Sequence, residues 1–221
     1  MMDQNPKAFI FDLNGTMIDD MEFHVRAWHA LLNEDLHAQK DWDEVRRNMY
    51  GKNTEVFVRI LGDDHLTADE MEHWSVEKER RYQKAFLPHL KLIDGLDDFL
   101  KKAKNKNIRM AIGSAAIQFN IDFVLDNLHI RDYFSAIVSA DDVTLSKPDP
   151  ETFLNAAELL QIKPADCIVF EDAPKGVEAA MNAGMRTVVL NTMHQPEEFR
   201  KYSNVIAFVN NYQDAFLQTL L

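Results

Sequence analysis

Short apolar runs rich in β-branched residues alternate along this chain with segments of helical periodicity, and this alternation restricts the fold more than any other feature. The expected strands are Ala8–Leu13, Arg109–Gly113, Ala136–Ser139, Cys167–Phe170, Thr187–Leu190 and Val205–Phe208. The helical segments between them are Leu96–Lys104, Gln118–Asn127, Pro150–Leu160 and Pro174–Ala183. Because strands that alternate with helices form parallel sheets covered on both faces, the sequence predicts an α/β fold built on a parallel sheet.

One region interrupts this alternation. Between about Asp20 and Leu87 the spacing is helical and no convincing strand is present. The helices expected here are Glu22–Asn33, Asp43–Tyr50, Thr54–Leu61 and Thr67–Lys84. We therefore expect a helical insertion over residues 20–87, within an α/β core made of residues 1–19 and 88–221. Hinged near Asp19 and Leu87-Pro88, such an insertion can act as a lid that excludes water. A helical pair packed permanently on the core is the alternative.

The composition limits the class of protein and of partner. Of 221 residues, 46% are hydrophobic and 27% charged, as in globular proteins, and no stretch approaches the roughly 20 apolar residues of a membrane span. Residues 1–7 lack the basic start and apolar run of a signal peptide, so we expect a cytoplasmic protein. The net charge of −12 argues against nucleic-acid and membrane partners, although a small anion can bind where a metal or lysine reverses the local field. Cys167, the sole cysteine, is expected to be buried in its apolar run.

An acid and an amide follow the first expected strand. Residues two apart on a strand point the same way, so Asp12 and Asn14 would face one site at the strand's end, just before Gly15. A carboxylate beside a proton-transferring group suits nucleophilic chemistry, but the amide of Asn14 cannot exchange protons near neutral pH. The same residues could also form a simple turn.

Further polar residues follow other strands. Ser114 could hold an anion's oxygen together with nearby backbone amides such as that of Ala115. Lys147 follows the third strand on a turn stiffened by prolines, where a fixed ammonium could neutralise a carboxylate and a phosphoryl group together. Glu171 and Asp172 follow the fourth strand, and two adjacent buried acids suit an all-oxygen Mg²⁺ site. Each residue alone has a plain structural explanation, but their joint placement at one edge of a sheet indicates a site.

These segments resemble the four ordered motifs of the haloacid dehalogenase superfamily. The matching segments are Phe11–Thr16, Ser114, Ser146–Pro150 and Phe170–Gly176, and they are spread over nearly the whole chain. Within the superfamily, Glu22–Trp28 is similar to the start of the cap in β-phosphoglucomutase and related sugar-phosphate phosphatases. The resemblance implies a Rossmann-like core, a helical cap and Mg²⁺-dependent phosphoryl transfer.

The resemblance also implies roles for individual residues. Asp12 would attack phosphorus and form an aspartyl-phosphate, as carboxylate nucleophiles do. Ser114 and Lys147 would orient and neutralise the phosphoryl group, with Lys147 acting as a charge stabiliser. The implied Mg²⁺ ligands are Asp12, the backbone carbonyl of Asn14, and Asp172, with Glu171 in support. The related phosphatases carry an acid/base aspartate at the position of Asn14, so slow turnover is expected here.

Substrate contacts are expected from the cap. His24 matches a histidine of β-phosphoglucomutase, and a surface helix histidine is the equal alternative. Thr54 stands where the mutase carries a substrate-binding arginine, and Lys52 could supply the charge instead. Lys78 falls near a cap lysine of the mutase but lies in a charge run, which usually forms a solvated face.

The expected function is that of a Mg²⁺-dependent phosphatase of a small phosphorylated metabolite such as a sugar phosphate. The missing arginine weakens the alternative of a β-phosphoglucomutase, which must clamp a second phosphate. A protein that binds a phosphorylated ligand without catalysis is the alternative of another class, and retention of Asp12 argues against it. We expect a monomer or a weak homodimer.

Overall fold

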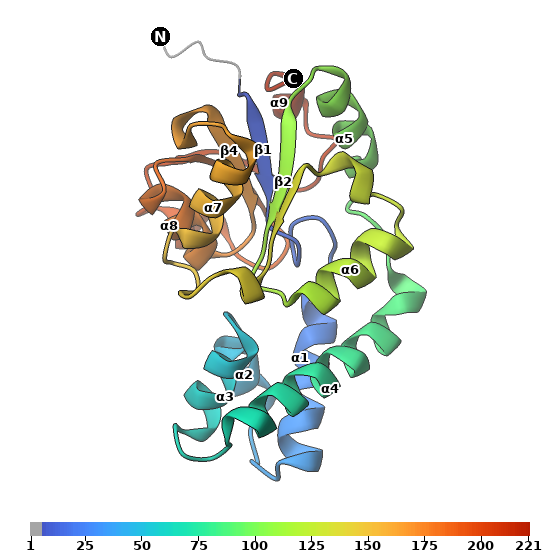
Figure 1. The fold of residues 1–221 in the computed structure, drawn as a ribbon, viewed down its shortest axis with the longest axis vertical. Coiled ribbons are helices and arrows are strands. Elements are labelled where there is room, and N and C mark those ends of the chain that lie inside the picture. Colours follow the sequence, from blue (N-terminus) through green and yellow to red (C-terminus); the bar gives the residue numbers. More distant parts are fainter. Residues whose placement is uncertain (1–5) are drawn as a thin grey trace. The chain divides into compact units, whose positions relative to one another are not determined.

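A parallel sheet of six strands, in the order β3-β2-β1-β4-β5-β6, forms the centre of the α/β unit in the computed structural model, which describes residues 6–221 (Figure 1). The strands are β1 Ala8–Phe11, β2 Arg109–Gly113, β3 Ala136–Val138, β4 Cys167–Glu171, β5 Arg186–Leu190 and β6 Val205–Val209. All six lie within one or two residues of the expected strands. The α/β architecture expected from the alternation is therefore confirmed. Residues 1–5, part of the segment used to expect a cytoplasmic location, lie outside the described residues.

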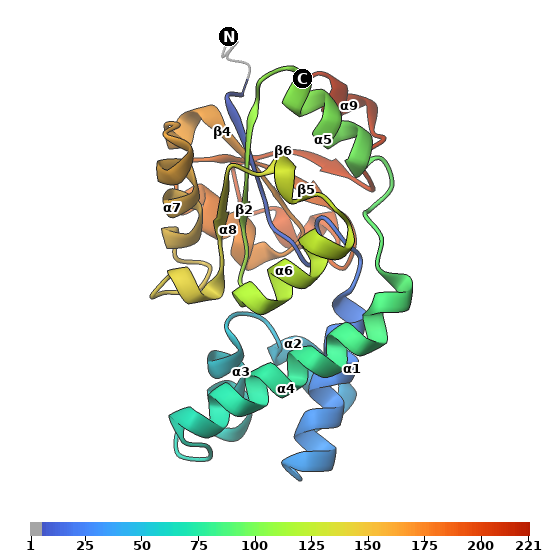
Figure 2. The ribbon, with the colours of Figure 1, turned by 45° about the vertical axis from the view of Figure 1, so that its right-hand side comes forward.

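Helices cover both faces of the sheet, as Figures 1 and 2 show. One face carries α5 Leu96–Asn105, α6 Gln118–Asn127 and the short α9 Ala215–Gln218, and the other carries α7 Glu151–Leu160 and α8 Pro174–Asn182. Short 3₁₀ segments occupy Arg131–Tyr133, Ala140–Asp142, Pro164–Asp166 and Pro196–Phe199. Within residues 6–221 no helix is both long and apolar enough to cross a membrane.

Alternate residues of β1 build the cores of the two faces. Ala8 and Ile10 join the buried aliphatic cluster beneath α7 and α8, which includes Cys167 as expected. Phe9 and Phe11 point to the opposite face and pack in an aromatic cluster completed by Phe99, Phe170 and Tyr212. This alternation follows from the two-residue period of a strand. Packing on both faces fixes the ends of β1 and β4, and it thereby fixes the positions of the residues that follow these strands.

Recognisable sequence signals mark the ends of several helices. Pro174 occupies the first turn of α8, and Gly184 follows its end with a φ of 72°, a conformation that glycine adopts without strain. Thr67 caps α4 in a capping box with Glu70, whose amide donates to the threonine hydroxyl at 3.3 Å. Pro150, the first residue of the expected helix Pro150–Leu160, is the N-cap of α7, which begins one residue later at Glu151.

Residues Asp20–Leu90 form a second compact unit, made entirely of helices, and Lys91–Leu221 belongs with residues 6–19 to the first. The helices of this second unit are α1 Met21–Ala30, α2 Trp42–Asn48, α3 Asn53–Leu61 and α4 Ala68–Phe86, with a π-helical turn at Leu31–Asp35 and a 3₁₀ turn at Leu87–His89. Trp28 is buried in this unit and packs edge-on against Phe57 at 5.0 Å.

Candidate active site

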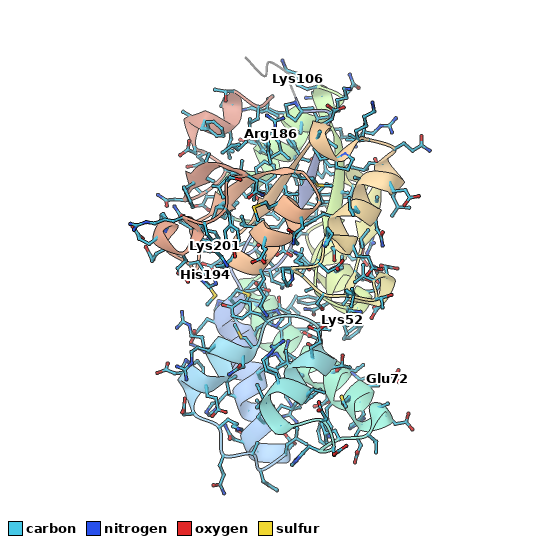
Figure 3. The ribbon with its side chains drawn as sticks, turned by 90° about the vertical axis from the view of Figure 1, so that its left-hand side faces the viewer. Lys52, Glu72, Lys106, Arg186, His194 and Lys201 are labelled. Carbon is cyan, nitrogen blue, oxygen red and sulfur yellow. The ribbon has the colours of Figure 1, made fainter. Side chains whose placement is uncertain are left out.

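The carboxyl ends of the strands meet at one edge of the sheet. Figure 3 shows this direction for β5, because Arg186 marks its start and His194 lies just beyond its end. β1 lies between β2 and β4, and the amide of Asp12 donates to the carbonyl of Phe170 at 2.9 Å. Asp12, Ser114 and Asp172 each follow directly after one of these three strands. The sheet therefore gathers residues that are far apart in the sequence.

Lys147 connects two acids at this edge. Its Nζ lies 2.6 Å from Oδ1 of Asp12 and 2.9 Å from Oε1 of Glu171, and it lies over the ring of Phe153 at 4.7 Å. All three charged side chains are buried. Burial alone would lower the pKa of Lys147, but the charges of Asp12 and Glu171 outweigh it and raise that pKa. The lysine is thus a fixed positive charge beside the carboxylate of Asp12.

Both oxygens of the Glu171 carboxylate accept hydrogen bonds. Its Oε1 accepts from Lys147, while its Oε2 accepts from the amides of Asp172 and Ala173 at 2.8 and 2.7 Å. Both amides lie just before α8, which begins at Pro174, and a negative charge is favoured near the N-terminus of a helix. A Cβ on Gly176 would overlap this carboxylate, so glycine is required there. Glu171 holds Lys147 in place, which matches a supporting role at a metal site better than direct ligation.

Asp172 approaches the turn that follows β1. Its Oδ1 accepts from the hydroxyl of Thr16 at 3.4 Å. Gly15 lies beneath the carboxylate with a φ of 75°, and a Cβ at this position would overlap Asp172. The glycine serves two purposes, since it permits both the left-handed backbone and the close approach of the acid.

The carbonyl of Asn14 has a defined direction. The amide of Gly15 donates to the carbonyl of Ile18 at 2.8 Å, and Asn14 and Ile18 form a single β-bridge. In a trans peptide the C=O points away from the N–H of the same unit. The Asn14 carbonyl therefore points away from Ile18.

The donors at this edge fit Mg²⁺. Among residues 6–221 no group of three or more His, Cys, Asp and Glu side chains is arranged to hold a metal ion. The implied set contains only two such side chains, Asp12 and Asp172, together with the backbone carbonyl of Asn14. Three oxygen donors leave room for water and a phosphate oxygen, which is how Mg²⁺ is usually bound.

Ser114 provides a further polar group at the same edge. It is buried, its amide donates to the carbonyl of Val138 at 2.9 Å, and its hydroxyl accepts from the amide of Ala116 at 3.1 Å. The backbone thus turns tightly around the hydroxyl, with half-buried Ala115 at the centre of the turn. A hydroxyl proton remains available for donation to an anion.

The helical unit contains its own buried polar cluster. Nζ of Lys78 lies 2.7 Å from Nδ1 of His24 and 2.9 Å from Oε1 of Glu79, and these three residues are at most 8% exposed. Because an ammonium can only donate, Nδ1 of His24 accepts and the proton lies on Nε2, which faces Asp20 at 3.3 Å. Lys78 therefore does not lie on a solvated face, and of the two alternatives for His24 the surface histidine is wrong. These residues lie on the inner sides of α4 and α1, where pairing compensates for burial.

The cluster also includes Tyr82 and Asn53, which were not predicted from the sequence as site residues. Tyr82 donates to Asp20 and stacks on the ring of His24 at 3.8 Å, and Asn53 donates to Glu79 at 3.0 Å. The spacing of the inner residues of α4, namely Ser75, Lys78, Glu79, Tyr82 and Phe86, was the available signal. Half-buried Lys52 lies one residue before Asn53, and its backbone amide donates to Glu55. The contacts described for the cluster involve Asn53 rather than Lys52.

Comparison with known proteins assigns the family. Residues 9–190 match the family model described as haloacid dehalogenase-like hydrolase. The chain belongs to the haloacid dehalogenase-like hydrolase family. It is 35% identical to a β-phosphoglucomutase of Bacillus subtilis, with 82% of each chain covered, and 28% identical to a phosphorylated carbohydrates phosphatase of Thermotoga maritima, covering 82% of this chain and 83% of the relative.

A solved structure supports the same assignment. The β-phosphoglucomutase of Clostridium difficile superposes with a TM-score of 0.84 at 26% identity, covering 97% of this chain and 96% of that chain. The expected superfamily, its β-phosphoglucomutase-like and sugar-phosphate phosphatase branch, and the Rossmann-like fold with a helical insertion are confirmed. The protein is thus an enzyme of the haloacid dehalogenase-like family, of the phosphatase or β-phosphoglucomutase kind. Membership of this family implies a Mg²⁺ cofactor.

Proposed function

We propose that this haloacid dehalogenase-like enzyme is a Mg²⁺-dependent phosphatase of a small phosphorylated metabolite, such as a sugar phosphate. The observation that carries the proposal is the Asp12 carboxylate, buried and held at 2.6 Å by a permanently charged lysine. Lys147 neutralises charge that the phosphoryl group would bring to this carboxylate. The likeness to a phosphorylated carbohydrates phosphatase supports the substrate class.

The reaction would proceed in two displacements. An oxygen of Asp12 forms a bond to phosphorus while the bond to the leaving alkoxide oxygen breaks, and the alkoxide takes a proton from solvent. Water then attacks phosphorus, the bond between phosphorus and the Asp12 oxygen breaks, and a proton of the water passes to solvent, which releases inorganic phosphate and restores the carboxylate. Ser114 and Lys147 bind and orient the phosphoryl oxygens throughout. Mg²⁺, held by Asp12, Asp172 and the Asn14 carbonyl, would neutralise phosphoryl charge when bound.

Asn14 makes this enzyme slow. Its amide can donate a hydrogen bond to the leaving oxygen but cannot deliver a proton, and acid–base catalysis is typically worth about 10²–10⁴-fold. Poor alkoxide leaving groups suffer most, whereas acyl phosphates need less help. Hydrolysis of the aspartyl-phosphate also slows, so we propose a burst of one product per active site before slow turnover.

Intact-mass spectrometry tests the nucleophile. The protein incubated with Mg²⁺ and acetyl phosphate should gain one phosphoryl group, and peptide mapping should place it on Asp12. The Asp12→Asn variant, which keeps the shape of the side chain, should gain none, and Asp12→Ala provides a second test if the amide variant folds poorly. The absence of both an adduct and turnover in the parent protein would support a non-catalytic phospho-ligand binder instead.

A mutase is the second candidate, and the 35% identity to the β-phosphoglucomutase of Bacillus subtilis favours it. It would convert β-glucose 1-phosphate to the 6-phosphate and require a sugar bisphosphate for activation. In either enzyme we propose His24, Lys52 and Lys78 of the helical unit, and Ala115 of the α/β unit, as substrate-binding residues. Conversion in the presence of the bisphosphate would replace the phosphatase proposal, and release of inorganic phosphate alone would support it.

A further inference from the structure

Two side-chain hydroxyls hold successive carbonyls of the turn that follows β1. The Thr192 hydroxyl donates to the carbonyl of Gly15 at 2.7 Å. The Tyr212 hydroxyl donates to the carbonyl of Thr16 at 3.1 Å. Thr192 lies beyond the end of β5 and Tyr212 beyond the end of β6, so neither belongs to the segments that carry the candidate active site. Both hydroxyls reach across the carboxyl edge of the sheet to this one turn.

The bond from Thr192 acts on the residue next to the Asn14 carbonyl. Gly15 is joined to the rest of the turn by its amide, which donates to Ile18 at 2.8 Å, and by its carbonyl, which accepts from Thr192. These two bonds hold the peptide units on both sides of the Gly15 Cα. Glycine has no side chain to restrict its dihedral angles, so the hydrogen bonds must set its φ of 75°. The peptide unit on the amino side contains the Asn14 carbonyl.

Tyr212 is itself rigidly held. Its ring is buried against Phe11, Phe99 and Phe170, at centroid distances of 6.3, 5.7 and 5.7 Å. Its amide donates to the carbonyl of Asp94 at 2.9 Å. Burial, together with the charges of Asp12 and Asp172, raises the pKa of the Tyr212 phenol, so the hydroxyl keeps its proton and acts as a donor. Tyr212 thereby ties the turn to the aromatic core.

We propose that Thr192 and Tyr212 are positioning residues that orient the Asn14 carbonyl, and with it the turn beside Asp172, for Mg²⁺ binding. They act through the backbone of Gly15 and Thr16 and need not touch the metal or the substrate. The inference rests on the proposed function, because it assigns the Asn14 carbonyl to the metal site. It adds two residues from the loops after β5 and β6 to that site.

Calorimetric titration of the substrate-free protein with Mg²⁺ tests this inference, because the measurement does not depend on catalysis. The variants Thr192→Val and Tyr212→Phe each remove one hydroxyl and preserve shape. Each should weaken Mg²⁺ binding by roughly 3- to 10-fold, the loss that corresponds to one hydrogen bond. Thr192→Ser retains the donor and should restore binding.

Matched controls exist within the same α/β unit. The Thr187 hydroxyl accepts from Asn204 at 2.9 Å and the Tyr202 hydroxyl donates to Glu178 at 2.9 Å. Thr187→Val and Tyr202→Phe also remove one hydrogen bond each, but they should leave Mg²⁺ affinity unchanged. Thermal unfolding of all variants would measure the loss of stability separately.

Each outcome is decisive. If the parent binds Mg²⁺ and the two variants bind it equally well, the positioning role is wrong while the phosphatase proposal stands. If the controls weaken binding as much as Thr192→Val and Tyr212→Phe do, general destabilisation explains the effect and the inference is overturned. If the parent binds no Mg²⁺, the metal assignment in the proposed function fails, and this inference fails with it.

Discussion

The ammonium nitrogen of Lys147 lies 2.6 Å from a carboxylate oxygen of Asp12, although 135 positions separate the two residues in the chain. The same nitrogen bonds Glu171, which in turn accepts from the amides of Asp172 and Ala173 just before α8. Asp12, the proposed nucleophile, is therefore held by Lys147, and the position of Lys147 depends in turn on Glu171 and the backbone just before α8. This arrangement connects the electrostatics of the site directly to the packing of the fold.

Lys147→Met should abolish most activity, because the two buried carboxylates of Asp12 and Glu171 would then lose the ammonium that bonds both of them. We expect the rate of phosphoryl transfer to fall by at least about 100-fold, the usual effect of removing one electrostatic stabiliser. The control is Lys7→Met, which breaks the 2.8 Å ion pair of Lys7 with Asp166 near the start of β1. Steady-state kinetics on both variants would measure the difference, and equal rates in the two would contradict the role of Lys147.

Asn14→Asp should raise hydrolysis of a sugar phosphate by at least roughly tenfold, because a carboxyl group can protonate the leaving oxygen and then deprotonate water. The burst should disappear as the second step accelerates. Asn191→Asp places the same new charge just after β5 and should leave the rate unchanged. Rapid mixing with separate detection of the released alcohol and of inorganic phosphate would follow the first and the second step, and an unchanged rate in Asn14→Asp would refute the idea that proton transfer limits this enzyme.

Gly15→Ala should impair the metal site more than it impairs folding. Gly15 and Gly184 have almost the same backbone conformation, with φ of 75° and 72°, so alanine at either position should cost roughly 1–2 kcal/mol of stability. Only at Gly15 would the new methyl group overlap Asp172, whereas Gly184 has open space. We expect Mg²⁺ affinity to fall at least roughly tenfold in Gly15→Ala and to remain unchanged in Gly184→Ala. Calorimetry and urea unfolding would separate the two effects.

Glu79→Gln should destabilise the protein in a pH-dependent manner. Burial alone would raise the pKa of Glu79, but the charge and hydrogen bond of Lys78, the neighbouring His24 and the hydrogen bond from Asn53 together outweigh it, and the pKa lies below its ordinary value of 4.5. The stabilisation from the charged carboxylate is therefore present above pH 4.5 and is lost as the pH falls through the lowered pKa of the folded state. Near pH 7 the variant should lose about 3 kcal/mol, since it leaves Lys78 buried without its counter-ion.

Urea unfolding between pH 7 and pH 3 would measure this dependence. The difference in unfolding free energy between parent and Glu79→Gln should shrink as the pH falls below 4.5. Glu72, labelled in Figure 3, is exposed on the same helix, and Glu72→Gln should change stability little at any pH. A constant difference across this range would show that the charge of Glu79 is unimportant for stability.

The strands and helices were largely predictable from the sequence because their signals are local. The two-residue period of β1, the proline that starts α8 and the capping box at Thr67 each act within a few residues of the chain. The π-helical turn at Leu31–Asp35 was not predicted, because the helical spacing there runs on without a visible change. Burial of Lys78 was also missed, since the surrounding charges resemble an exposed face.

The local pattern of the chain places Asp12, Ser114 and Asp172 directly after strands, and parallel strands bring their carboxyl ends to one edge. Which groups touch at that edge depends on the packed fold. Thr192 and Tyr212 bond a turn that lies 177 and 196 positions away, and no local pattern signals such a bond. The physical reason is that a hydrogen bond requires two atoms within about 3 Å. Only the packed fold brings residues so distant in the chain that close.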